Sequence, residues 1–170
     1  MSRSKTRSKI YIPRQVKVPG IIDNLPVPQV MLKKLTNDMD NRVLRLRFAG
    51  NNGKDLAALV MYFAAAWLLA GEMDNGQELR DKLETGVREL GKAVLASPDA
   101  VNGPMYDTIL DLTALTTAVV AESTKGEYRK ASESLKAEGI VPFADEFMVT
   151  LAQAGLLQVV NSAKEADTGG

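Results

Sequence analysis

The sequence predicts an all-α protein, a single compact domain of five to six helices that follows an extended basic N-terminal arm. Apolar residues recur at three- and four-residue spacing through most of the chain, and clusters of Asn, Gly and Pro divide this pattern into segments. With 170 residues, of which 45% are hydrophobic, the chain is long enough to bury one sizeable core. We expect the arm at residues 1–27, the helical domain at 28–163 and a flexible tail at 164–170.

The arm is cationic and rich in proline. Prolines at positions 13, 19 and 26 rule out one continuous helix, because proline has no backbone N–H and disfavours helical backbone in the residue before it. The basic start is not followed by an apolar stretch with a small-residue cleavage site, so a secretory signal is not expected. We therefore expect a cytoplasmic location, or one within a phage-like particle.

Residues 28–48 fit two structures. One helical face is formed by apolar residues at spacings of three and four, while residues 42–48 alternate between polar and apolar as a strand would. We favour a helix for residues 28–36. The Asn- and Asp-rich segment 37–41 disfavours a helix interior, which leaves residues 43–49 as either helix or edge strand. The residues of the helical face are Leu32, Leu35, Met39, Val43 and Leu46.

Residues 54–70 predict a central helix that is apolar on every side and therefore enclosed, with Phe63 and Trp67 inside the core. The uncharged run 56–71 has 16 residues, fewer than the roughly 18 to 20 that cross a bilayer. No membrane partner is expected. An amphipathic helix follows to about residue 96, with Asn75 and Glu78 as a capping pair. Its apolar stripe comprises Leu79, Leu83, Val87, Leu90 and Val94.

Three further helices are predicted toward the C-terminus. Residues 102–104, Asn-Gly-Pro, begin one that runs to about residue 122. Thr124 and Glu127 match a capping box at the start of the next, which is expected to end at Gly139. The last is predicted over residues 142–161, with core positions Phe143, Phe147 and Leu151.

Charge is divided unequally along the chain, although the net charge is zero. Residues 1–50 hold eleven Lys and Arg against three Asp, a net charge of +8, and residues 51–170 hold ten against eighteen, a net charge of −8. Such asymmetry indicates a polyanionic partner for the basic half, or pairing between the basic half and an acidic body.

The composition excludes most catalytic chemistries. The chain has no His and no Cys, so Ser-His-Asp and Cys-His catalysis, thiolate metal sites and disulfides are absent. Residues 50–55 lack the spacing of a phosphate-binding loop, with Phe48 where its first glycine would stand and Asp55 after the lysine. Asp107 and Asp111 are four apart on one helix, a pattern typical of solvated surface. We expect no enzyme, cofactor or metal site.

The candidate binding residues are the basic side chains of the first fifty positions. A flexible cationic arm can bind the phosphates of DNA or RNA, cross to an acidic neighbouring subunit, or remain a solvated tail. If residues 42–48 form a strand, Arg45 and Arg47 share a face. The candidates are Arg3, Lys5, Arg7, Lys9, Arg14, Lys17, Lys33, Lys34, Arg42, Arg45 and Arg47.

These observations predict a non-catalytic structural or assembly protein, of the kind that serves as a phage or plasmid accessory component. Its basic arm would contact nucleic acid or the acidic surface of a neighbouring subunit, in a homo-oligomer or larger assembly. The alternative is a regulatory protein-binding module or inhibitor that acts through a groove between helices.

Overall fold

The computed structural model describes residues 23–99 and 101–157 of this chain. This part of the chain is all-α and contains no strand, apart from an isolated bridge between Pro26 and Thr124. Its helices are α3 (Gln29–Ala49), α4 (Gly53–Ala70), α5 (Gly76–Ala96), α6 (Gly103–Glu122), α7 (Lys125–Ser134) and α8 (Pro142–Gln153).

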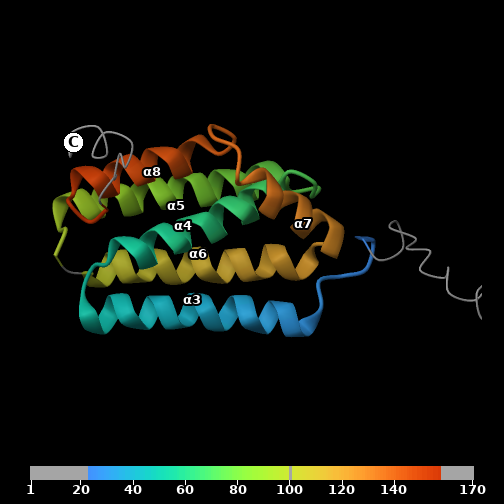
Figure 1. Cartoon of the computed structure of the whole chain (residues 1–170), viewed down its shortest axis with the longest axis horizontal. Coiled ribbons are helices and arrows are strands. Elements are labelled where there is room, and N and C mark those ends of the chain that lie inside the picture. Colours follow the sequence, from blue (N-terminus) through green and yellow to red (C-terminus); the bar gives the residue numbers. More distant parts are fainter. Residues whose placement is uncertain (1–22, 100, 158–170) are drawn as a thin grey trace, which may run out of the picture.

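The helices pack around α4. In Figure 1, α3 and α6 lie side by side, α5 lies against α8, and α4 crosses between the two pairs. Helix α4 contacts each of the other five, which explains why its sequence is apolar on every side. One continuous cluster of buried side chains joins all six helices.

Helix α4 is long and apolar enough to cross a membrane, with a mean hydropathy of 1.4, and it alone meets that test in the described ranges. However, 61% of it is buried inside the protein, and the core helix of a water-soluble protein passes the same test. Phe63 is fully buried, as expected. The prediction for Trp67 was wrong: its ring is half-buried at the edge of the core, 6.0 Å from the ring of Phe143 and 4.0 Å from the guanidinium carbon of Arg80.

Helix α3 is continuous, so the expected break at residues 37–41 and the possible strand at 42–48 were both wrong. The predicted helical face explains this result, since Leu35, Met39, Val43 and Leu46 are all buried. In addition, Asp38 bonds to Arg42 one turn later rather than to its own backbone, which removes the usual cost of Asp inside a helix. The helix ends at Gly50, whose φ of 87° favours glycine.

Local signals set most other helix boundaries. Thr124 and Glu127 form the predicted capping box, and the Asn102 side chain caps α6 by accepting from the Met105 N–H. Asn75 is the N-cap residue of α5, as expected, but its side chain makes no capping bond. Helix α7 ends before the expected Gly139, and α8 ends at Gln153 instead of continuing to residue 161.

Candidate functional site

The predicted basic residues fall into three groups. Lys33 and Lys34 are exposed in the first turns of α3, while Arg42, Arg45 and Arg47 belong to its second half. The six cations of the arm, Arg3, Lys5, Arg7, Lys9, Arg14 and Lys17, lie outside the described residues.

Arg42 and Arg45 both bind the carboxylate of Asp55. The Arg42 Nη1 lies 2.9 Å from Asp55 Oδ1, and Arg45 donates from Nε at 3.0 Å and from Nη2 at 2.8 Å. Asp55 lies in the first turn of α4 and is only 3% exposed. Hydrogen bonds from Arg45, and then from Arg42, hold the pKa of this carboxyl below its usual value. These two arginines therefore join α3 to α4, and their charge is compensated within the molecule.

A second contact between α3 and α4 adjoins this cluster. The Tyr62 hydroxyl donates to Asp38 Oδ2 at 2.5 Å, and the Arg42 Nε donates to the same oxygen at 2.9 Å. The bond from Tyr62, followed by the bond from Arg42, lowers the pKa of Asp38. Burial, together with the bond to Asp38, raises the pKa of Tyr62 to about 12. The cluster is thus a stabilising network and offers no free cation.

Arg47 has a different environment. Its guanidinium carbon lies 5.1 Å from the centre of the Tyr106 ring on α6 and 5.5 Å from that of Phe48. Because α3 is a helix, Arg45 and Arg47 do not share the face that a strand would give them. Arg47, Lys33 and Lys34 form no ion pair with any described residue, and they are the predicted cations on this part of the chain that remain available to a partner.

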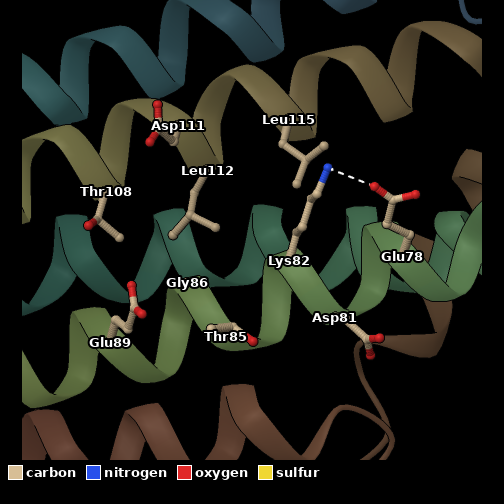
Figure 2. Close-up of a pocket in the computed structure, with 10 residues that line it drawn as sticks. All are labelled: Glu78, Asp81, Lys82, Thr85, Gly86, Glu89, Thr108, Asp111, Leu112 and Leu115. Atoms are coloured by element: carbon tan, nitrogen blue, oxygen red, sulfur yellow. Dashed lines mark ion pairs between the residues drawn. The ribbon is translucent and has the colours of Figure 1, made fainter.

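A groove of about 760 Å³ lies between α5 and α6 (Figure 2). It is open to solvent along its length, with side chains from α5 on one wall and from α6 on the other. Leu112 and Leu115 of α6 supply its apolar floor. The lining residues are Glu78, Asp81, Lys82, Thr85, Gly86, Glu89, Thr108, Asp111, Leu112 and Leu115.

The rim of the groove is acidic. It carries four carboxylates and one lysine, and that lysine, Lys82, pairs with Glu78 at 3.0 Å. Asp81 accepts a bond from Gln77, whereas Glu89 and Asp111 form no ion pair with a described residue. A carboxylate rim above an apolar floor suits a peptide segment rich in Lys or Arg. The aliphatic stems of these side chains can pack on the leucines while their charged ends pair with the carboxylates.

Gly86 allows the two helices to approach. A Cβ atom at this position would lie 2.6 Å from Leu112 Cδ2 and 3.1 Å from its Cγ, so a larger residue would displace the leucine. Gly86 and Leu112 thus set how closely α5 and α6 approach each other at the groove.

The sequence did not reveal this groove. On α5, Glu78 pairs with Lys82 at 3.0 Å and Glu84 pairs with Arg88 at 2.8 Å, each four residues apart. Asp111 was assigned to solvated surface, and it is indeed exposed. The available signal was the acidic side of α5 opposite its apolar stripe, but its approach to Asp111 depends on the packing of two helices.

No group of three or more His, Cys, Asp or Glu in residues 23–99 and 101–157 could hold a metal ion. Comparison with protein-family models, with curated proteins and with solved structures gives no match for this chain.

Proposed function

We propose that this protein is a non-catalytic assembly component that self-associates through its basic N-terminal arm, which contacts an acidic surface of a neighbouring subunit. The observation that carries the proposal is the acidic α5–α6 groove on a body that is itself acidic. Residues 1–22 contain six Lys and Arg and no acid, whereas residues 23–157 contain 14 against 19 Asp and Glu, a net charge of −5. Opposite charges on two parts of one chain favour association between copies.

The pairing of Arg42 and Arg45 supports a protein partner over a nucleic acid. A phosphate backbone would be bound most strongly if the arm continued into a basic surface on the folded body. Two of the five body cations in the candidate set, Arg42 and Arg45, are instead paired with Asp38 and Asp55. The net negative charge of the body would repel a nucleic acid that lay close to it.

Sedimentation velocity tests this function. We expect the full chain to associate at about 0.1 M salt and to dissociate at about 1 M, where the Debye length falls from about 10 Å to about 3 Å. A variant in which the six arm cations are replaced by Gln should be monomeric at both salt concentrations. Association of this variant at the level of the unmodified chain would refute the proposal.

Nucleic-acid binding is the second candidate function, and the exposure of Lys33 and Lys34 near the root of the arm favours it. These two lysines and the six arm cations could neutralise eight phosphates of a duplex, with a log-log salt slope of about −7. Fluorescence anisotropy with a labelled duplex would measure that slope. Tight binding by a full chain that stays monomeric would favour this candidate.

A further inference from the structure

We propose that the α5–α6 groove is the docking site for the arm of a second copy of this chain, and that residues 3–9 are the segment that docks. This inference rests on the proposed function and specifies which acidic surface the arm contacts. Three observations support it: the charge and spacing of the arm, the dimensions of the groove, and the length of chain that links residues 3–9 to the body.

The charge pattern of residues 3–9 matches the groove. Arg3, Lys5, Arg7 and Lys9 alternate with Ser and Thr, and in extended backbone every second side chain points to the same side. Four cations would then share one face over a length of about 20 Å. Along α5, Glu78 and Glu89 are eleven residues apart, or about 16 Å. The cationic run is therefore about as long as the acidic wall.

The groove can accommodate long basic side chains. Its volume of about 760 Å³ is lined by Leu112 and Leu115 below the carboxylates. The aliphatic stems of Lys and Arg can cover these leucines while their charged ends reach Asp81, Glu89 or Asp111. In Figure 2, Glu89 belongs to α5 and Asp111 to α6, so each helix contributes a carboxylate to the groove.

The root of the arm is held by α7. Arg129 of α7 pairs with Asp23 at 2.8 Å, and the Lys125 N–H donates to the Leu25 carbonyl at 2.8 Å. Helix α7 packs on α4, and α4 lies behind the groove in Figure 2.

In the proposed dimer the arm enters the groove of the second copy. Residues 10–22 can span about 43 Å when extended, which is enough to cross an interface between two copies. Two such arms, each in the groove of the other copy, would form a closed twofold dimer.

A mixing experiment with full-length chains tests the inference. The arm variant carries Arg3→Gln, Lys5→Gln, Arg7→Gln and Lys9→Gln, and the groove variant carries Asp81→Asn, Glu89→Gln and Asp111→Asn. The matched control removes three exposed acids outside the groove, through Asp40→Asn, Asp74→Asn and Glu138→Gln. Circular dichroism would verify that each variant is folded.

Sedimentation velocity at about 0.1 M salt should show each of the two variants as a monomer and the control as a dimer. The loss of three charge contacts should raise the dissociation constant about ten-fold or more. Mixed in equal amounts, the two variants should form a heterodimer, since the intact arm of one meets the intact groove of the other.

Each other result overturns a specific claim. If the groove variant dimerises as well as the control, the groove is not the docking site, although the arm still drives association. If both variants are monomers but the mixture gives no heterodimer, the arm does not dock in a second copy. If the arm variant itself dimerises, residues 3–9 are not the docking segment. If the variant that lacks all six arm cations also dimerises, the proposed function fails. If the unmodified chain is monomeric and binds duplex DNA, the partner of the arm is nucleic acid.

Discussion

Tyr62 of α4 donates a hydrogen bond of 2.5 Å to the Asp38 carboxylate of α3, and this bond joins the central helix to the first described helix. Burial and the bond to Asp38 raise the pKa of Tyr62 to about 12, above the ordinary value of 10.0. A raised pKa means that folding favours the neutral phenol, so the stabilisation is complete below pH 10 and is lost as the pH rises through 12.

We therefore expect the free energy of unfolding to fall between pH 10 and 12, and to fall less steeply in Tyr62→Phe. At pH about 8 the variant should be less stable by about 1 to 2 kcal/mol, because a hydrogen bond to a charged acceptor is lost. Urea unfolding across this range measures both effects. Equal alkaline slopes for the two proteins would show that Tyr62 does not titrate as described.

Asp55→Asn should destabilise the protein by about 2 kcal/mol, because two arginines lose their shared carboxylate. The loss should be smaller than that for a fully buried pair, since the side chains of Arg42 and Arg45 are 25% and 53% exposed and remain hydrated. Urea unfolding at neutral pH measures the change. The exposed Asp40, changed to Asn, is the control and should alter stability by less than about 0.5 kcal/mol.

The same carboxyl predicts an acid dependence. The pKa of Asp55 in the folded protein is lowered from 3.8, so its stabilisation is present above that pH and is lost as the pH falls through the folded value. Asp55→Asn should lose less stability than the unmodified chain when the pH is lowered below 3.8. A steeper acid loss in the variant would contradict this explanation.

The capping box at the start of α7 should contribute measurably to stability. Thr124→Ala removes the side chain that accepts from the Glu127 N–H, at an expected cost of about 1 kcal/mol. Asn75→Ala, at the start of α5, is the matched control, since the Asn75 side chain makes no capping bond. Thermal unfolding of the two variants should therefore differ, and equal losses would argue against the capping geometry.

Two glycines at the first positions of helices should respond differently to substitution. A Cβ on Gly53 would overlap the Leu156 carbonyl, whereas a Cβ on Gly103 would meet no atom within 4 Å. Gly53→Ala should cost about 1 to 3 kcal/mol through overpacking, while Gly103→Ala should be neutral or slightly stabilising. Unfolding in urea would compare them, and equal stability would place residue 156 away from the start of α4.

Helical periodicity predicted most of the fold. The stripe on α5 gave the correct buried residues Leu83, Val87, Leu90 and Val94, and the local pattern at Asn102-Gly103-Pro104 gave the correct start of α6. The prediction for segment 37–41 was wrong because it relied on the low helix propensity of Asn and Asp. Burial of Met39 in the core stabilises the helix there and outweighs that propensity. The position of Trp67 at the edge of the core depends on how Phe143 of α8 and Arg80 of α5 pack beside it, which periodicity does not show.

The candidate site was predicted only in part. The division of charge along the chain is a property of sequence and suggested a nucleic acid or an acidic protein surface as a partner. The groove depends on the close approach of α5 and α6 at Gly86 and Leu112, and the pairing of Arg42 and Arg45 depends on Asp55, which lies on the next helix. Both arise from contacts between helices, so neither follows from a local pattern.

Disulfide trapping tests most directly whether the arm of one copy lies in the groove of another, and the chain has no native cysteine to interfere. One copy would carry Ser4→Cys in the arm and the other Thr85→Cys in the groove, with the exposed Asn37→Cys on α3 as the control position. Mild oxidation of the mixture at about 0.1 M salt should give a covalent dimer through positions 4 and 85, and far less through 4 and 37. Equal trapping at positions 85 and 37, or none at either, would contradict docking of the arm in the groove.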